Sequence, residues 1–386
     1  MKKIQKIIRK IPVVADFSKI FYDWRKENKL QKRIKAFIKS GKLPFSKKAP
    51  VEYRLAYEPT IRCNLKCKMC YQGQTRALRR EELSTADSFK IFEKLKDKVK
   101  TIKLIGGEPT VRDDIFEIIS YWDKAGKKII LHSNFTLLDD KKIEILKNFK
   151  GVKDALTSID GPKEIHDAVR GVQGSFDKMK KAIASMKEKM PDASITVFAM
   201  MLISDNLRAL KDLIDIAKEI GIGTINVLFE QVYSAEDKEK AQKIFKSIFG
   251  WNESEYRLNT QIRNPVFPQG IDAQKIKQEL AEIRLYGMEK GCFVNFVPFN
   301  YYKNLDKYLG LKKTKTFCLK LLSPELRVNQ TGDVIWCDVI EKSFGNLLEK
   351  TPDEIWLSDE YQKFREYLFK NSLPICNRCC KASYLK

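Results

Sequence analysis

The 386-residue chain has no long hydrophobic run. No stretch of about 18 apolar residues occurs, so the sequence predicts no transmembrane helix. Lysines and arginines from Lys2 to Lys10 interrupt any apolar core of a secretory signal. Histidine is also scarce, with only His132 and His166. We therefore expect a cytoplasmic protein with reduced thiols, in which closely spaced cysteines are metal ligands rather than disulfides.

Acidic residues are nearly missing from the first 50 positions, which hold 16 Lys and Arg but three acids. This segment carries +13 of the net charge of +23, so an anionic partner is expected to meet mainly the N-terminus. Apolar residues recur there at helical spacing, with a break at Pro12 and an end at Gly41 and Pro44. The apolar groups are Ile4, Ile7, Ile8 and Ile11, then Phe17, Ile20, Phe21 and Trp24, and finally Leu30, Ile34, Phe37 and Ile38. We predict a basic arm of short amphipathic helices over residues 1–50.

Two interpretations of this arm remain open. Cations around an apolar stripe are typical of a helix that lies on an anionic membrane surface, which here would be the inner face of the membrane. A helical extension that packs on the main domain, with its lysines in solvent, fits the same pattern. Nucleic acid is not expected as a partner, because no RNA-binding module is visible.

From residue 51 to 265, apolar runs of strand length alternate with helical segments. The runs are Tyr53–Pro59, Ile102–Ile105, Lys128–Leu131, Ala155–Ile159, Ile195–Met201 and Ile225–Phe229, and the helical segments include Thr85–Lys98, Asp114–Ala125, Asp140–Phe149, Phe176–Lys189 and Asn206–Ile220. Six such units in a row predict an α/β fold, a partial (β/α)6 TIM-like barrel with a parallel sheet. Residues 266–310 are expected to form a bridge, and residues 311–386 a small C-terminal domain that holds the late cysteines.

Three cysteines with the spacing Cys-x3-Cys-x2-Cys follow the first predicted strand. Cys63, Cys67 and Cys70 can bind three irons of a [4Fe–4S] cube, which leaves the fourth iron open to a substrate-like molecule. A zinc ion would usually need a fourth nearby cysteine or histidine, and the histidines lie far along the chain.

At this point the chain, over roughly residues 52–386, resembles the radical S-adenosylmethionine (radical SAM) enzymes, whose signature is this triplet. The second family feature is Ile105-Gly106-Gly107-Glu108-Pro109 after the second strand, which implies a grip on the methionyl amino group by Gly106, Gly107 and Glu108. The sequence departs from the family pattern at two positions. Met69 stands where an aromatic residue is usual. At the end of the third strand, Phe135 replaces a glycine that follows Asn134, the residue expected beside the cofactor. By the same resemblance, Ser158 and Asp160 would meet the ribose and Arg170 the methionyl carboxylate, an ion that an arginine fork fits. His166 is expected to be a surface residue at the start of a helix.

The late cysteines resemble the auxiliary-cluster domain called Twitch, the shorter relative of SPASM. Cys318, Cys337, Cys376 and Cys379 would ligate one auxiliary [4Fe–4S] cluster that handles electron transfer. Cys380 competes with Cys379 as the last ligand, and a zinc ribbon built from the same four cysteines remains the rival. Cys292 is expected to be a buried strand thiol.

The resemblance implies an enzyme that cleaves S-adenosylmethionine reductively to a 5′-deoxyadenosyl radical and abstracts hydrogen from an unactivated carbon. An electron donor such as a ferredoxin or flavodoxin is implied as a partner. Glu230 and Tyr233, at the end of the sixth strand, are expected to face the substrate as catalytic residues. The basic arm favours a membrane lipid or lipid-linked substrate; the alternatives are maturation of a ribosomally made peptide or protein, and a non-catalytic iron–sulfur or zinc scaffold.

Overall fold

The structure, a computed structural model of the full chain, describes residues 12–43, 45, 48–72, 81–203, 206–259, 272–310 and 315–385. In the first helix, side chains are described from Arg25 onward, Lys26 excepted. The helix predicted around Ile4, Ile7, Ile8 and Ile11 lies outside the described residues.

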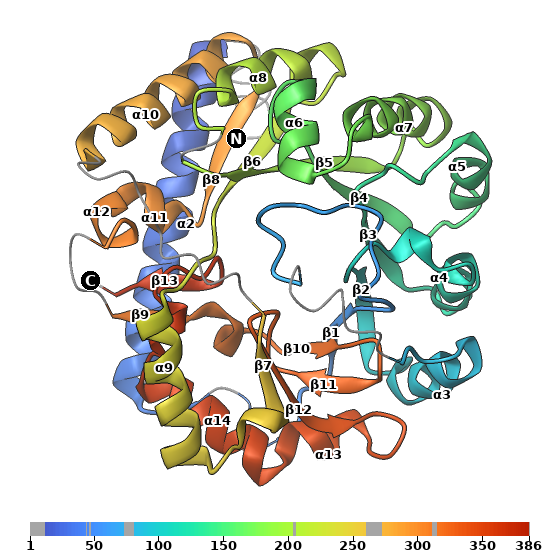
Figure 1. The fold of residues 1–386 in the computed structure, drawn as a ribbon, viewed down its shortest axis with the longest axis vertical. Helices are drawn as coiled ribbons and strands as arrows, with labels where there is room; N and C mark the ends of the chain where they lie inside the picture. The colour runs from blue at the N-terminus through green and yellow to red at the C-terminus, as the bar shows by residue number, and fades with distance from the viewer. Residues whose placement is uncertain are drawn as a thin grey trace, which may run out of the picture.

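Six parallel strands follow one another around a central space, with helices outside them (Figure 1). The strands are β1 (Tyr53–Tyr57), β2 (Val99–Leu104), β3 (Lys128–His132), β4 (Val152–Ser158), β5 (Ser194–Met201) and β6 (Thr224–Phe229). The helices between them are α3 (Thr85–Leu95), α4 (Ile115–Lys124), α5 (Asp140–Leu146), α6 (Lys163–Arg170), α7 (Ser175–Lys189) and α8 (Leu210–Glu219), with the short turn η1 (Pro109–Val111) after β2. This arrangement confirms the predicted α/β partial barrel.

Two strands from the C-terminal half extend the barrel sheet at its two edges. β8 (Phe293–Val297) pairs in parallel with β6, and β10 (Glu325–Val328) pairs in parallel with β1. The segment expected as a bridge therefore supplies a sheet strand, together with α10 (Ala273–Glu289), α11 (Phe299–Lys303) and α12 (Leu305–Tyr308).

Beyond β10 the sheet continues with antiparallel strands. They are β11 (Asp333–Ile335), β12 (Ile340–Asn346) and β7 (Tyr256–Leu258), which complete an 11-stranded sheet. A separate pair joins β9 (Thr316–Cys318) to β13 (Ala382–Tyr384). The remaining helical elements are α9 (Ala235–Ile244), η2 (Phe245–Phe249), η3 (Glu253–Glu255), η4 (Leu319–Leu322), α13 (Pro352–Leu357), α14 (Asp359–Lys370) and η5 (Pro374–Cys376).

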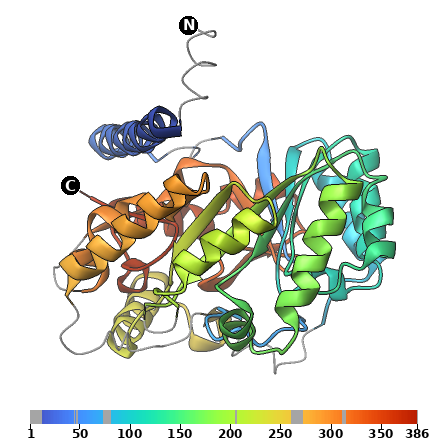
Figure 2. The ribbon, with the colours of Figure 1, turned by 90° about the horizontal axis from the view of Figure 1, so that it is seen from above.

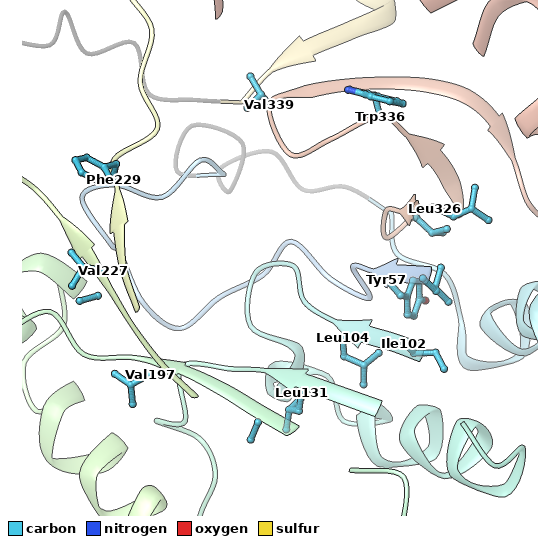
Figure 3. Close-up of a cluster of buried hydrophobic side chains, with 14 of the residues drawn as sticks. Tyr57, Ile102, Leu104, Leu131, Val197, Val227, Phe229, Leu326, Trp336 and Val339 are labelled. Atoms are coloured by element: carbon cyan, nitrogen blue, oxygen red, sulfur yellow. The ribbon is translucent and has the colours of Figure 1, made fainter. Parts of the chain in front are cut away.

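Alternation along the strands separates an outer core from the barrel interior. Ile102, Leu131 and Val197 have no exposed surface and belong to the apolar cluster of Figure 3. Their neighbours in the sequence point the other way, into the barrel. Because those inward residues include His132 and Phe198, the interior is mixed in polarity and can receive a ligand.

From Pro12 onward, the described part of the arm forms one helix, α2 (Pro12–Ser40), where two short helices were expected. No glycine or proline interrupts residues 13–40, so nothing in the sequence ends the helix before Gly41, which adopts φ +62°. Figure 2 shows α2 along one side of the molecule. Among the described helices, none combines the length and the hydrophobicity needed to span a bilayer.

One face of α2 is docked on the C-terminal region. Gln31 Nε2 donates to Ser383 Oγ (2.7 Å) and to the Tyr384 carbonyl (3.3 Å). Asn300 Nδ2 donates to Glu27 Oε1 (3.1 Å), and both side chains are buried. The second half of the arm thus packs on the main body. Its outward face carries exposed cations, namely Arg25, Lys29, Lys32, Arg33, Lys35 and Lys39.

Candidate active site

Three thiols face a cavity of about 200 Å³ at the carboxyl ends of the barrel strands. Cys63, Cys67 and Cys70 lie on the loop after β1, and all three line this cavity. The strand ends supply the rest of its wall, which includes Gly106, Gly107, Glu108, His132, Ser133, Asn134, Ser158, Arg170, Phe198, Met200 and Leu228. Parallel barrels keep their active sites at this end, so we take this cavity as the candidate active site.

Gly106 and Gly107 let the loop after β2 lie directly against the thiol loop. The Gly107 amide donates to Thr60 O and the Glu108 amide to Arg62 O, each at 2.8 Å. A Cβ atom at Gly107 would lie 2.1 Å from Arg62 O, and one at Gly106 would lie 2.5 Å from Thr60 O. Gly106 also has φ +131°, a conformation that L side chains rarely adopt. Glycine is therefore needed at both positions because the backbone of the thiol loop leaves no room for a side chain.

Glu108 is buried, and donors surround its carboxylate. Oε1 accepts from the Thr110 amide (3.1 Å), Thr110 Oγ1 (2.6 Å) and Ser133 Oγ (2.7 Å). Oε2 accepts from the Asn134 amide (2.7 Å). Burial raises the pKa of Glu108, and these hydrogen bonds oppose the rise. The carboxylate is held in one orientation at the cavity wall, where it can accept from a cationic group.

Polar groups also point at the thiol sulfurs. Cys63 Sγ accepts from the Leu65 amide at 3.4 Å and has Asn134 Nδ2 at 4.0 Å. The turn that carries Asn134 is kept although Phe135 replaces the expected glycine: Phe135 is fully buried and adopts φ +64°. Such a conformation costs a non-glycine residue about 1–3 kcal/mol, which the burial of the ring offsets.

Arg170 links the thiol loop to the strand ends. Its Nε donates to Asp160 Oδ2 at 2.6 Å, and its Nη1 lies 3.8 Å from Cys67 Sγ. Asp160 has no exposed surface, and its other oxygen accepts from the Met200 amide at 3.0 Å. Asp160 therefore lies behind Arg170, outside the residues that line the cavity, whereas Ser158 and Arg170 line it.

His166 is buried, with 2% of its surface exposed, so the expectation of a surface residue is wrong. Its Nδ1 accepts from the Asp160 amide at 3.3 Å, and its ring lies 5.7 Å from that of Phe176. Burial lowers the pKa of His166 to about 4, which leaves the ring neutral and Nδ1 able to accept. His166 thus supports the turn that holds Asp160.

Glu230 and Tyr233 do not line the thiol cavity. Tyr233 is buried, and the Glu230 carbonyl accepts from Tyr308 Oη at 2.9 Å, toward α12. Leu228, two residues before Glu230, is the β6 residue that reaches the cavity.

A buried ionic group ties β10 to the thiol loop. Arg327 forms an ion pair with Glu58 and donates to Tyr71 Oη at 3.1 Å, next to Cys70. Gln72 Nε2 donates to Glu58 Oε2 at 3.0 Å. Arg327 and Glu58 are 269 residues apart in the chain, so no local pattern in the sequence predicts this contact.

The late cysteines gather around the β9–β13 pair. Cys318 ends β9 and pairs with Ala382 of β13. Just before β13, the chain turns from Cys376 to Cys379, where the Cys379 amide donates to Cys376 O at 3.2 Å. Backbone amides also point at sulfur here. The Ile340 amide lies 3.4 Å from Cys337 Sγ and the Lys381 amide 3.3 Å from Cys379 Sγ. Amide donors at sulfur suit thiolates bound to iron.

These four thiols oppose one another's ionisation. Burial raises the pKa of Cys337 to about 12, with the Asp338 carboxylate adding to the rise. Burial and the neighbouring Cys318 and Cys337 hold the pKa of Cys376 well above its ordinary value. A bound cation removes this conflict, because it stabilises clustered thiolates. The donor set therefore fits a metal cluster.

Cys380 lies beside Cys379, and a hydrogen bond joins the two thiols. The Cys380 thiol donates to Gln231 Oε1 at 3.2 Å, at the end of β6. Cys292 is fully buried directly before β8, as expected. Within the described ranges, no three His, Cys, Asp or Glu side chains are arranged to hold a metal ion. In a [4Fe–4S] cube each thiolate binds its own iron, so its ligands stand farther apart than those of a single zinc ion.

Two family models match the chain. One, described as the radical SAM superfamily, matches residues 57–217, and the other, described as SPASM, an iron–sulfur cluster-binding domain, matches residues 318–380. The first covers the barrel and the thiol loop, and the second covers the four late cysteines that we list as candidate ligands.

Several curated proteins are similar to the chain. The AdoMet-dependent heme synthase of Methanosarcina barkeri is 28% identical over 81% of this chain and 84% of its own length. The Fe-coproporphyrin III synthase of the same organism is 27% identical over 89% of this chain and 84% of its own length. The subtilosin biosynthesis protein AlbA of Bacillus subtilis is 32% identical over 46% of this chain and 39% of its own.

Among solved structures, Streptococcus suis SuiB bound to its precursor peptide SuiA has a similar fold. It matches with a TM-score of 0.59 at 18% identity, over 90% of this chain and 74% of that one. At this identity the likeness concerns the fold alone.

Proposed function

The chain belongs to the radical SAM superfamily and carries a C-terminal SPASM domain, and on this premise we propose that Cys63, Cys67 and Cys70 hold the cluster that binds S-adenosylmethionine. The protein is an enzyme whose cofactors are [4Fe–4S] clusters and S-adenosylmethionine. When bound, these groups would supply reductive cleavage of S-adenosylmethionine and hydrogen abstraction from an unactivated carbon, while the residues of this chain hold and orient them. The observation that carries the proposal is the placing of three thiols around one cavity with Glu108 and Arg170 in its wall.

The cavity offers complementary groups for both ends of the methionyl moiety. Glu108 presents a carboxylate to the ammonium, and Arg170 presents a guanidinium to the carboxylate. Ser158 and Asn134 line the same cavity and would contact the nucleoside. Asp160 is a positioning residue: it is occupied by Arg170 and Met200, and it sets the direction of the Arg170 guanidinium.

The four late cysteines would hold an auxiliary [4Fe–4S] cluster. Cys318, Cys337, Cys376 and Cys379 supply four sulfurs, and amides at Cys337 and Cys379 stabilise the thiolate form. Cys379 is our choice as the fourth ligand because the Lys381 amide points at its sulfur, while the neighbouring Cys380 thiol donates to Gln231. When bound, this cluster would supply electron transfer with the substrate, and a ferredoxin or flavodoxin would be the external electron donor.

For the substrate, a ribosomally made peptide or protein has better support than a lipid. AlbA is named for the biosynthesis of a bacteriocin, and SuiB has been solved with a peptide bound. The position of the basic arm also favours a peptide over a lipid. Glu27 and Leu30 of α2 adjoin the amino ends of the strands beside Arg54, whereas the thiol cavity opens at the carboxyl ends. A membrane surface that α2 binds would therefore lie on the side of the protein opposite to the thiol cavity.

A tetrapyrrole is the second candidate substrate. The relatives that match more than four fifths of both chains are named as heme synthase and Fe-coproporphyrin III synthase. A mixed polar and apolar barrel interior suits a ring system that carries carboxylates. On either substrate the hydrogen abstraction is the same.

The test is anaerobic reconstitution of the full chain with iron and sulfide, followed by reduction in the presence of S-adenosylmethionine. We expect formation of 5′-deoxyadenosine by the wild type and none by a variant in which Cys63, Cys67 and Cys70 are replaced by alanine. Fe-coproporphyrin III and candidate precursor peptides are then added separately, and the compound that raises the yield and changes in mass identifies the substrate class. Absence of 5′-deoxyadenosine from the reconstituted wild type would refute the proposal.

A further inference from the structure

The apolar side of α2 is occupied by the protein itself. Ile34 has no exposed surface, and Gln31 and Glu27 are buried against the C-terminal region. A helix that lies alone on a membrane would insert this stripe between the lipids. In this chain the stripe packs on the main body, so a contact of the arm with a partner has to be made by other residues.

The chain between α2 and β1 carries charge of one sign. Residues 28–51 include eight Lys or Arg and no Asp or Glu. The exposed cations of α2 are followed by Lys42 and Lys48, which are also exposed. Glu52, the first acid after them, is paired with Lys100 at 2.5 Å. Figure 2 shows that this segment runs to β1 along the same side of the molecule as α2, so this side presents cations without acids of the same segment.

Three large apolar residues are exposed among these cations. Val51, directly before β1, is 94% exposed, and Phe45 and Ile38 are 40% and 42% exposed. The other exposed large apolar residues of the described chain are Ile145, Ile248, Leu285, Leu348 and Leu357. Exposed apolar residues are ordinary when they are scattered, but several on one short basic segment indicate an interaction surface.

The turn at Phe45 is fixed through its backbone. The Phe45 carbonyl accepts from Trp356 Nε1 (3.1 Å) and Arg365 Nη1 (3.2 Å), and both of these residues are buried. Phe45 adopts φ +56°, a left-handed conformation that is costly for a residue other than glycine. The ring of Phe135 offsets the same cost by complete burial, whereas Phe45 stays 40% exposed. A strained turn that keeps an aromatic residue at the surface points to a partner at this position.

The chemistry of this surface matches an anionic membrane. Aromatic and aliphatic side chains enter the boundary between lipid headgroups and acyl chains, and Lys and Arg beside them attract anionic headgroups. An acidic protein would also attract the cations, but it would need an apolar patch of matching shape for Phe45 and Val51. A fluid lipid surface accepts these side chains without a matching shape, and it is therefore the partner that fits both the charge and the exposed apolar residues.

We propose that the outward face of α2 and the segment from α2 to β1 dock on an anionic membrane surface, with Phe45 and Val51 inserted among the headgroups. Val51 precedes β1 at the amino end of the barrel, whereas the thiol loop follows the carboxyl end of the same strand. The docked protein therefore keeps its thiol cavity turned away from the membrane, so that a substrate reaches it from the aqueous side. This inference does not rest on the proposed function, because no residue of the thiol cavity takes part in it.

Co-flotation of the full chain with lipid vesicles tests the proposal. Vesicles of phosphatidylcholine alone are compared with vesicles in which about a third of the lipid is phosphatidylglycerol. We expect binding to the anionic vesicles to be tighter by roughly tenfold or more, because several exposed cations act together. Equal binding to both kinds of vesicle, or binding to neither, would overturn the proposal.

The apolar contacts are measured with Phe45→Ser and Val51→Ser combined in one chain. We expect this variant to bind anionic vesicles more weakly by roughly tenfold or more, because two apolar side chains no longer leave water on binding. The matched control replaces Ile145 of α5 and Ile248 of η2, which are 42% and 45% exposed, with serine. This control should bind as the wild type does. Undiminished binding by the Phe45→Ser and Val51→Ser variant would indicate a purely electrostatic contact, such as an acidic protein or a nucleic acid makes, and would refute the membrane assignment.

Single changes at Val51 separate binding from folding. Because Val51 is almost fully exposed, Val51→Ser should keep the wild-type melting temperature and still weaken vesicle binding. In Val51→Trp, the fluorescence of the added indole should shift to the blue with anionic vesicles; co-flotation without this shift would place the residue outside the membrane and contradict the proposal. Without vesicles, the Phe45→Ser and Val51→Ser variant should form as much 5′-deoxyadenosine as the wild type. Failure of the membrane contact is thereby distinguished from failure of the proposed function.

Discussion

Arg170 is held by Asp160 from behind, with Nε and Oδ2 2.6 Å apart and the carboxylate fully buried. Asp160→Asn keeps the shape of the side chain but leaves the Arg170 guanidinium without its counter-charge. Breaking a buried pair in this way costs about 3–5 kcal/mol. We expect a lower melting temperature and a KM for S-adenosylmethionine that rises roughly tenfold or more.

The control for this variant is Asp177→Asn, which removes an exposed partner of Lys163 at 2.6 Å. Surface pairs contribute little, so this variant should keep the wild-type KM. Steady-state formation of 5′-deoxyadenosine at varied S-adenosylmethionine measures both. An unchanged KM in Asp160→Asn would show that Arg170 needs no positioning.

Gly107→Ala should displace the thiol loop. A Cβ atom there would lie 2.1 Å from Arg62 O and 2.5 Å from Ile61 O, both backbone atoms that cannot yield without moving the loop. We expect less iron bound at the triplet and a loss of S-adenosylmethionine cleavage, measured by an iron assay and by 5′-deoxyadenosine. Gly223→Ala, where a Cβ atom meets nothing within 4 Å, is the matched control and should behave as the wild type.

The two groups of cysteines should load iron separately. The wild type should bind about eight irons, and a variant with Cys337 and Cys376 replaced by alanine about four, because one cube is lost. Cys380→Ala should retain about eight, since Cys318, Cys337, Cys376 and Cys379 remain as the four ligands. Loss of a whole cube in Cys380→Ala would instead make Cys380 the fourth ligand.

The outward face of α2 should bind anionic vesicles. Replacing Lys29, Lys32 and Lys35 with glutamine removes three exposed charges, each worth about 1 kcal/mol near such a surface. We expect vesicle binding, measured by co-flotation, to fall roughly 100-fold. Replacing the exposed Lys141, Lys150 and Lys153 is the matched control. Equal binding by both variants would leave α2 as a packing helix only.

Local patterns in the sequence were sufficient for the six barrel strands. The run predicted at Ile195–Met201 forms β5 (Ser194–Met201), because apolar alternation there matches the two faces of a strand. Pairing between distant segments was not predictable in this way. β8 and β10 carry no local sign that they would join β6 and β1, since a sheet edge is filled by whichever strand the tertiary fold brings to it.

The same division applies to the candidate site. The triplet and Glu108 could be found because motif residues lie on loops directly after strands. The positioning role of Asp160 could not be assigned, since part of its surroundings, the Met200 amide of β5, comes from another part of the chain. Charge and periodicity also left two interpretations of the arm open, because neither pattern predicts the buried polar contacts that Gln31 and Glu27 make with the C-terminal region.

The parallel pairing of β10 with β1 limits how this protein can be divided. A truncation before residue 318 would not release a smaller working barrel; it would leave the amide and carbonyl groups of β1 unpaired along one side. Unprotected strand edges of this kind recruit other chains and promote aggregation. It would also remove Arg327 and leave Glu58 as a buried, uncompensated acid. The barrel and the region from residue 318 onward therefore have to be expressed as a single unit. In a chimera with a relative, they have to be exchanged together.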